Sequence, residues 1–225
     1  MSLNESKGNM YEFVTHTWNP IKGACLHDCA YCFMKRWGKQ KPPRLVDTEL
    51  KCKKGAGNFI FVGSSTDIFA NDIPGDWILS VLEACRRDND NKYLFQTKNP
   101  ERFLNIVKNA DIMPKNFVFC TTLESDIFYQ EIMNKSPMPY YRAAFTEQIS
   151  KYCKTFVTIE PILRFNLRPF VEMLKRCNAV QINIGADSCG HKMPEPNKDE
   201  LLTLIEQIKT FSTIEKKRNI ERLLK

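Results

Sequence analysis

The sequence predicts an α/β fold in which parallel strands alternate with helices, and two patterns lead to this prediction. Short runs of aromatic and β-branched residues recur along the chain, and their nearly continuous apolar character is typical of strands buried on both faces of a parallel sheet. Between the runs, apolar residues return at helical spacing. Together these patterns indicate one domain over residues 13–211, built from βα repeats with right-handed crossovers.

The expected strands begin with an extended segment at residues 13–15, which leads into a loop that contains three cysteines. The other five runs lie at residues 59–62, 93–96, 117–120, 155–159 and 180–184. The sequence thus predicts six strands. Periodicity alone does not decide whether their sheet closes.

Five helical segments accompany these strands. Asn99 is expected to cap the second segment, with Pro100 at its first helical position, and Asn197 is expected to open the last. The segments are residues 77–85, 100–107, 141–149, 170–177 and 197–208. Because their apolar stripes are typical of core packing, we assign these helices no catalytic role.

Three stretches fall outside the βα pattern. Residues 1–12 are expected to form a flexible tail, and residues 36–58, rich in lysine and glycine, a long loop with one helical turn. Residues 212–225 are expected to form a basic terminal helix. The inner side of that helix would carry Ile214, Ile220, Leu223 and Leu224.

The composition is that of a globular domain. The chain has 225 residues, of which 43% are apolar and 26% charged. No apolar run approaches the length of a membrane span, and the N-terminus lacks the apolar segment of a signal peptide, so we expect a cytoplasmic protein with no membrane partner. Nine cysteines, several of them within apolar segments, fit a reducing compartment better than a disulfide framework.

The formal net charge is +7, and part of the positive excess lies at residues 35–54 and 216–218. Clustered positive charge attracts nucleic acid or an anionic substrate, although such runs are more often only solvated surface. Contact with nucleic acid therefore stays open at this point.

Three cysteines within eight residues give the clearest chemical signal. Cys25, Cys29 and Cys32 follow the pattern Cys-x3-Cys-x2-Cys, and soft thiolates select zinc, copper(I) or iron–sulfur clusters. A structural zinc site needs four ligands, whereas a cluster held by three sulfurs leaves one iron free to bind a small molecule. Two interpretations follow: an iron–sulfur cluster, or a zinc site completed by His27 or Cys52.

With Tyr31 directly before the last cysteine, the motif resembles the signature of the radical S-adenosylmethionine (SAM) superfamily. The resemblance implies that each of the three cysteines binds one iron of a [4Fe-4S] cluster, and that the fourth iron binds the amino and carboxylate groups of SAM. It implies a partial (βα)6 TIM-like barrel with parallel strands, and the count of six expected strands agrees. It also implies a reductant such as flavodoxin or ferredoxin.

Polar or small residues follow the expected strands, at the edge where parallel βα folds collect ligand-binding groups. By the resemblance, Gly63, Ser64 and Ser65 would hold the SAM amino group; a plain turn is the alternative. Lys98 would pair with the SAM carboxylate as a point charge, unless it is a solvated lysine at a helix entry.

The later strand ends supply further candidates for cofactor binding. Thr122 and Glu124 follow the fourth strand, and Glu124 is expected to accept hydrogen bonds from ribose hydroxyls. Glu160 follows the fifth strand, where a carboxylate is costly unless it is paired, and Arg164 is a plausible partner. Gly185 follows the sixth.

Cys189, just after the sixth strand, is a candidate catalytic residue. It would face the cavity as a hydrogen-atom donor to a product radical, and the alternative is an inert loop cysteine. The sequence offers no residue that reads a particular base or functional group.

Further motifs narrow the resemblance to one branch of the superfamily. They are Thr-Trp-Asn-Pro at 17–20, Phe-Val-Gly-Ser-Ser-Thr-Asp at 61–67, Gln-Thr-Lys-Asn-Pro-Glu-Arg at 96–102, Glu-Pro-Ile-Leu at 160–163 and Gly-Ala-Asp at 185–187. They are similar to a phage and prokaryotic branch of radical SAM proteins that is distantly similar to spore photoproduct lyase. The similarity runs from Val14 to Phe211. Many members of that branch have Gly-Cys where this chain has Ala24-Cys25, and their first cysteine interval is longer. This difference weakens the case for assigning a substrate of that branch to this protein.

The sequence-based hypothesis is therefore a radical SAM enzyme. Its [4Fe-4S] cluster would cleave SAM reductively into methionine and a 5′-deoxyadenosyl radical, which abstracts a hydrogen atom from a small molecule, a nucleoside or nucleic acid. The excess of basic over acidic residues slightly favours nucleic acid as the substrate. The alternative is a zinc-stapled module that binds nucleic acid without catalysis.

Overall fold

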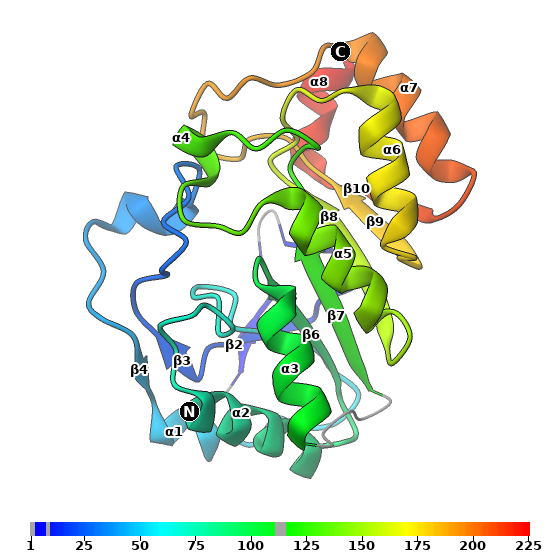
Figure 1. Cartoon of the computed structure of the whole chain (residues 1–225). Coiled ribbons are helices and arrows are strands. Elements are labelled where there is room, and N and C mark those ends of the chain that lie inside the picture. Colours follow the sequence, from blue (N-terminus) through cyan, green and yellow to red (C-terminus); the bar gives the residue numbers. More distant parts are fainter. Residues whose placement is uncertain (1–2, 8–9, 111–115) are drawn as a thin grey trace.

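The computed structural model describes residues 3–7, 10–110 and 116–225 and contains the expected parallel sheet (Figure 1). Within these ranges, an 8-stranded sheet has the order β1-β2-β5-β6-β7-β8-β9-β10. Its strands are β1 (Asn4–Glu5), β2 (His16–Trp18), β5 (Phe59–Val62), β6 (Lys92–Thr97), β7 (Phe117–Thr122), β8 (Lys154–Ile159), β9 (Gln181–Ile184) and β10 (Thr213–Lys216). All neighbours from β2 to β10 pair in parallel, whereas β1 is antiparallel to β2. Because β1 and β10 remain edges, the sheet is a partial barrel that does not close.

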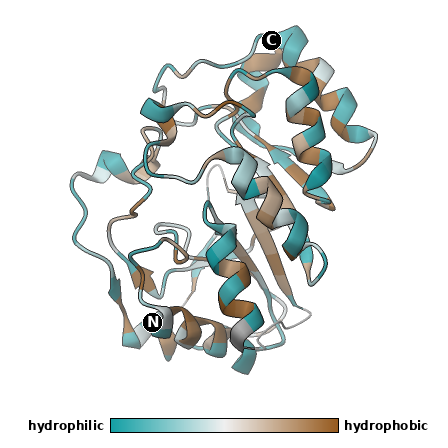
Figure 2. Ribbon diagram, viewed as in Figure 1, coloured by the Kyte–Doolittle hydropathy of each residue, from teal (hydrophilic) through white to brown (hydrophobic). Residues whose placement is uncertain are grey.

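Five long helices follow successive strands and cover the outer face of the sheet. They are α2 (Gly75–Arg87), α3 (Pro100–Ala110), α5 (Pro139–Ile149), α6 (Leu167–Arg176) and α7 (Lys198–Lys209). The hydropathy colouring shows hydrophobic and hydrophilic faces on these helices (Figure 2). Asn197 opens α7 as expected, because its side chain accepts from Glu200 N–H at 2.9 Å and Glu200 accepts from Asn197 N–H at 2.8 Å. Over the described ranges, no helix has both the length and the apolar character that crossing a bilayer requires.

Shorter elements lie in the connections and after β10. They are β3 (Ile21–Lys22), the 3-10 helix η1 (Phe33–Trp37), β4 (Arg44–Leu45), α1 (Asp47–Leu50), α4 (Gln130–Met133), the 3-10 helix η2 (Arg218–Ile220) and α8 (Glu221–Leu224). The single helical turn expected within residues 36–58 is α1.

The core has an outer and an inner part. Outward-facing strand residues such as Phe95 and Ile182 pack with the helices in two clusters. A third cluster lies on the inner face of the sheet, where Leu94, Cys120 and Phe156 contact Tyr11 of the N-terminal segment. Alternating strand residues therefore face two apolar layers, as expected for a parallel sheet buried on both sides.

Two expectations for the chain ends are wrong. In the described part of residues 1–12, Asn4–Glu5 pairs with β2 and Tyr11 is 5% exposed, because its ring fills the inner face and its hydroxyl donates to Gln96 at 2.8 Å. Residues 1–2 and 8–9 of the expected tail lie outside the described residues. Residues 212–225 do not form one helix: they begin with β10, which pairs in parallel with β9, before η2 and α8.

Candidate functional site

The cysteine loop follows β2 and docks against a segment far along the chain. Ala30 N–H donates to the Ile132 carbonyl at 2.8 Å, and Lys135 N–H donates to the His27 carbonyl at 3.1 Å. Cys29 Sγ lies 3.3 Å from Ser136 Oγ. The loop is therefore fixed to residues 132–136, which include the end of α4.

The loop presents three free thiols. Cys29 is buried, whereas Cys25 and Cys32 are half-buried. Backbone N–H groups of Asp67 and His27 donate toward the Cys25 sulfur, but burial and then the charge of Asp67 raise the pKa of this thiol to about 12. A bound metal reverses that balance, because a coordinating thiol is deprotonated. Within the described residues, no three His, Cys, Asp or Glu side chains are already gathered as metal ligands.

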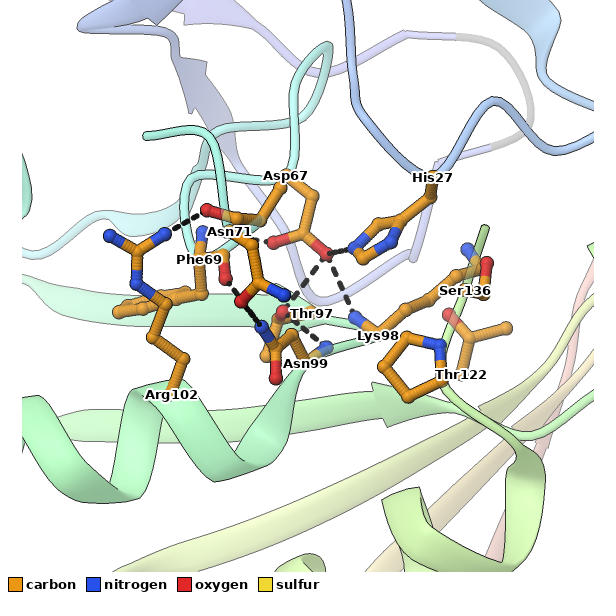
Figure 3. A network of polar contacts seen from close by, with 12 residues as sticks. His27, Asp67, Phe69, Asn71, Thr97, Lys98, Asn99, Arg102, Thr122 and Ser136 are labelled. Carbon is orange, nitrogen blue, oxygen red and sulfur yellow. Dashed lines mark hydrogen bonds and ion pairs between the residues drawn. The ribbon is translucent and has the colours of Figure 1, made fainter. Parts of the chain in front are cut away.

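Asp67 organises the polar network beside the loop (Figure 3). Its Oδ2 accepts from Thr97 Oγ1 at 2.9 Å and from Lys98 N–H at 2.8 Å, and it lies 2.8 Å from His27 Nε2. Burial raises the pKa of Asp67, but the hydrogen bond and charge of His27 and these other donors outweigh burial, so the pKa lies below its usual value. Because an ionised carboxylate only accepts, His27 donates from Nε2.

His27 has a second ring nitrogen that is buried without a hydrogen bond. The residue is 3% exposed, and Nδ1 has no partner among the described residues. A carboxylate that fixes one imidazole nitrogen while the other stays available is the usual arrangement of metal-binding histidines. The available Nδ1 therefore bears on whether the cysteine loop holds an iron–sulfur cluster or a zinc ion.

Tyr31 and Glu124 meet directly. Tyr31 donates a short hydrogen bond to Glu124 Oε1, and Arg142 Nη1 lies 2.8 Å from Glu124 Oε2. Both side chains of the Glu124–Arg142 ion pair are 0% exposed. Arg142 also donates to the carbonyl of Thr122 at 2.6 Å. The carboxylate expected to accept from ribose hydroxyls therefore already accepts from Tyr31 and Arg142.

Lys98 lies next to this pair. Its Nζ is 5.3 Å from the centre of the Tyr31 ring, and among the described residues no carboxylate oxygen is within ion-pair distance of it. Burial lowers the pKa of Lys98, but the neighbouring Cys29 and Glu124 outweigh burial and raise it above the usual value. A half-buried cation is thus held close to the cysteine loop.

The buried carboxylate predicts a loss of stability in acid. Burial raises the pKa of Glu124, but Arg142 and Lys98 outweigh burial and depress it below 4.5. The resulting stabilisation is complete well above pH 4.5 and is lost as the pH falls through the depressed folded value. We expect the free energy of unfolding, measured with urea from pH 7 to pH 3, to fall less steeply for Glu124→Gln than for the wild type. Equal slopes would contradict this account.

The segment after β5 is held by the Thr-Trp-Asn-Pro motif. Asn19 Oδ1 accepts from Ser64 Oγ at 3.2 Å, Ser65 N–H at 3.1 Å and Ser65 Oγ at 3.1 Å. Gly63 has φ +75, and a Cβ there would lie 2.6 Å from Ile68 Cγ2, so only glycine fits. The structure thus places these three residues in a tight turn braced by Asn19.

A second cluster of polar side chains lies at the carboxyl ends of β8, β9 and β10. Glu160 Oε2 lies 2.5 Å from Lys217 Nζ, and Oε1 accepts from Asn219 Nδ2 at 2.9 Å and from Ser188 Oγ at 3.1 Å. The expectation that Arg164 pairs with Glu160 is therefore wrong, because the chain after β10 brings Lys217 to the carboxylate instead. A Cβ on Gly185 would lie 2.9 Å from Glu160 Oε1, which explains the glycine.

Cys189 lies in the loop after β9 and is exposed. Its N–H donates to Asp187 Oδ1 at 3.1 Å, and Asp187 also lies 2.7 Å from His191 Nδ1. Cys52, one possible fourth zinc ligand, ends the turn after α1. The Lys54 ammonium donates to the Cys52 carbonyl at 3.4 Å and pairs with Asp88, shortly before β6, at 2.7 Å. In the described part of the chain, Cys52 is not gathered with two other potential metal ligands.

Asn99 was expected only as a helix cap and Arg102 only as the end of a motif, so their part in building this site was not predicted from the sequence. Asn99 Nδ2 donates to the Phe69 carbonyl at 3.1 Å, and Arg102 donates to the carbonyls of Ala70 and Ile73, so these polar residues brace the loop after Asp67 (Figure 3). Arg142 was also missed. Its place on the apolar stripe of α5, seven residues before Ile149, is a signal of a buried, paired arginine.

Comparisons with known proteins gave one matching family model and several similar solved structures. The family model described as "Protein of unknown function (DUF5131)" matches residues 9–165. No curated protein matches the chain. A cysteine-to-alanine mutant of spore photoproduct lyase is similar in structure, with a TM-score of 0.68 and 12% identity over 95% of this chain and 80% of that chain. A cysteine-to-serine mutant has a TM-score of 0.67 and 12% identity over 92% and 78%.

A further mutant of that lyase, with bound AdoMet and dinucleoside spore photoproduct, has a TM-score of 0.59 and 12% identity over 93% of this chain and 66% of that chain. At these identities the likeness shows a shared fold, which is the partial parallel barrel described above.

Proposed function

Since the chain belongs to the DUF5131 family of proteins of unknown function, we propose that it is a radical SAM enzyme. One observation carries this proposal: three free thiols share a loop that adjoins the carboxyl ends of an open parallel barrel, with the half-buried Lys98 beside them. Active sites of parallel βα folds form at this edge. The fold shared with spore photoproduct lyase supports the same proposal.

The residues of the loop suit a [4Fe-4S] cluster by their chemistry. Cys25, Cys29 and Cys32 would hold it, and backbone N–H groups already donate toward the Cys25 sulfur, an interaction that tunes iron–sulfur clusters. When bound, the cluster and SAM supply one-electron cleavage of the sulfonium C–S bond, which gives methionine and a 5′-deoxyadenosyl radical that takes a hydrogen atom from the substrate.

The chain's own groups bind and orient in this proposal. Lys98, a cation with no carboxylate partner among the described residues, would bind the SAM carboxylate. Gly63, Ser64 and Ser65 would border the SAM amino group, with Asn19 fixing their turn. Tyr31, Thr122 and Glu124 would act through the buried Arg142 network rather than through direct ribose contacts.

The last strand ends would complete the site. Glu160 and Gly185 lie together there, and Cys189 stays a candidate hydrogen-atom donor from its loop. We further propose a substrate that is a nucleoside or nucleic acid and a reductant such as flavodoxin or ferredoxin. A bound dinucleoside in one structural neighbour supports the substrate class.

The test is anaerobic reconstitution of the full chain with iron and sulfide, followed by reductant and SAM. We expect a broad brown absorption band and release of 5′-deoxyadenosine and methionine. A protein that binds no iron, or that binds a cluster but never cleaves SAM, would overturn the proposal.

A zinc-stapled module is the second candidate, and the buried Nδ1 of His27 favours it. With Nε2 bound to Asp67, Nδ1 is available as a fourth ligand beside the three cysteines. In this candidate function the loop is a structural site, and the protein binds nucleic acid without catalysis.

Replacement of His27 by glutamine separates the two candidates. If the loop holds a cluster through cysteines alone, His27→Gln should keep the brown band within about twofold, whereas a zinc site should lose at least about 10-fold in zinc affinity. Metal content and zinc affinity are measured on protein purified without oxygen. His16→Gln is the matched control, because among the described side chains the ring of His16 has a hydrogen bond only with Thr15 Oγ1, at 3.0 Å.

A further inference from the structure

A basic and aromatic segment follows the cysteine loop directly. We name residues 33–46 the basic arm; it runs from η1 through β4. Its five basic side chains are exposed, and no aspartate or glutamate interrupts it. They are Lys35, Arg36, Lys39, Lys41 and Arg44. The arm therefore carries a single sign of charge beside the candidate site.

Two aromatic rings of the arm lie in solvent. Phe33 is 42% exposed and Trp37 is 70% exposed. The Arg36 guanidinium lies 5.8 Å from the centre of each ring, so cation–π contacts help to fix both. The fold thus forgoes the stabilisation that burial of these rings would give.

The arm is anchored at several points although its rings are exposed. Ala24 N–H donates to the Lys41 carbonyl at 2.8 Å, and Val46 N–H donates to the Pro20 carbonyl at 2.9 Å. β3 and β4 pair through Ile21 and Leu45. Lys35 Nζ lies 2.9 Å from Asp28 Oδ1 within the cysteine loop. The fold thus holds the exposed rings and charges close to the three thiols.

We propose that the basic arm binds single-stranded nucleic acid. Bases would stack on Trp37 and Phe33, and phosphates would pair with Lys39, Lys41 and Arg44, because single-strand binders combine exposed aromatic platforms with a basic track. The inference deepens the proposed function, on which it rests for the link to chemistry, by naming the class of substrate and the surface that binds it.

A membrane surface fits the arm less well. Helices that lie in a membrane interface separate an apolar face from a charged face. In η1 the exposed rings flank Arg36 instead of forming an apolar face apart from the charges. A single strand, in which bases and phosphates alternate, matches that arrangement.

The test uses the full chain without SAM and a labelled oligothymidylate of about 12 nucleotides, near the upper range of single-strand site sizes. Fluorescence anisotropy at low salt should show binding, and Trp37→Ala should weaken it at least about fivefold, whereas Trp37→Phe should retain most of the affinity. Quenching of tryptophan fluorescence on binding should disappear in Trp37→Phe, because Trp18 is 1% exposed and Trp77 is partly buried.

Charge variants and a control complete the test. Lys39→Gln with Lys41→Gln should reduce the salt dependence of binding by a slope of about 0.7 for each phosphate that the variant no longer neutralises. Tyr152→Ala is the matched control, because Tyr152 is likewise an exposed aromatic residue beside a cation: it is 54% exposed, and Lys108 Nζ lies 5.1 Å from its ring. Tyr152 precedes the amino end of β8, whereas the candidate site lies at the carboxyl ends of the strands. Its replacement should therefore leave binding unchanged.

Absence of binding, or equal binding by Trp37→Ala, would overturn the inference. So would binding of the arm to vesicles of anionic lipid in place of the oligonucleotide. Oligonucleotide binding by a protein that never assembles a cluster would uphold this inference while overturning the proposed function, so the two failures are distinguishable.

Discussion

Replacement of Cys29 by alanine is expected to leave the protein unable to hold an iron–sulfur cluster. Cys29 is the central thiol of the three and is 5% exposed, so water cannot easily replace it as a ligand. Loss of one sulfur leaves two irons without a protein ligand. Since changes to groups that only support metal ligands cost 10–100-fold, loss of a ligand should lower release of 5′-deoxyadenosine by more than about 100-fold.

Absorption spectra and product release from anaerobically reconstituted protein measure this effect. Cys153→Ala is the matched control, because this cysteine is half-buried in the turn between α5 and β8 and lies outside the loop. The control should keep both the brown band and the product. A Cys29→Ala protein with the wild-type spectrum and yield would refute the assignment of this loop as the cluster site.

Replacement of Arg142 by methionine is expected to destabilise the protein by about 3–5 kcal/mol. Both members of the Glu124–Arg142 pair are 0% exposed, so the change leaves a buried carboxylate without its cation. The carbonyls of Thr122 and Pro137 also lose the guanidinium donor, which lies 2.6 and 2.8 Å away. Methionine fills similar space, so most of the loss is electrostatic.

Urea unfolding at pH 7 measures the loss. The exposed Arg168→Met is the control: Arg168 pairs with Glu172 at 3.0 Å with its side chain 90% exposed, so its loss should cost less than about 1 kcal/mol. Glu124→Gln combined with Arg142→Met should be more stable than the single Arg142 variant, because it removes the uncompensated charge. A cost below about 1 kcal/mol for Arg142→Met would contradict the structure of the pair.

The sheet and its long helices were predictable because their signals are local. Each apolar run from Phe59 to Ile184 became a strand, and the capping box at Asn197 depends on residues three apart. β10 was missed because Thr213–Lys216 is mostly exposed and Ile214 is its one apolar residue, which also fits a helical stripe with the leucines near the C-terminus. Its strand state comes from pairing with β9.

The candidate site was predictable only in part, because its partners come from distant residues. The roles of the three cysteines, Tyr31 and Lys98 stay predictions, although the structure brings Tyr31, Lys98 and Glu124 together. Glu160 pairs with a lysine 57 positions away, which no periodicity marks. Asp67 appeared only as the end of a motif, and its contact with His27 spans 40 positions.

The position of Lys217 has a consequence for biosynthesis. Glu160 and Gly185 leave the ribosome before Lys217, which follows β10, and before Asn219, which lies in η2. This corner of the barrel mouth therefore matures only when the newest segment docks beside β9. A nascent polypeptide halted near residue 211 would already possess the earlier strands yet lack two donors to that carboxylate, so this corner forms only after residues 217 and 219 have been added.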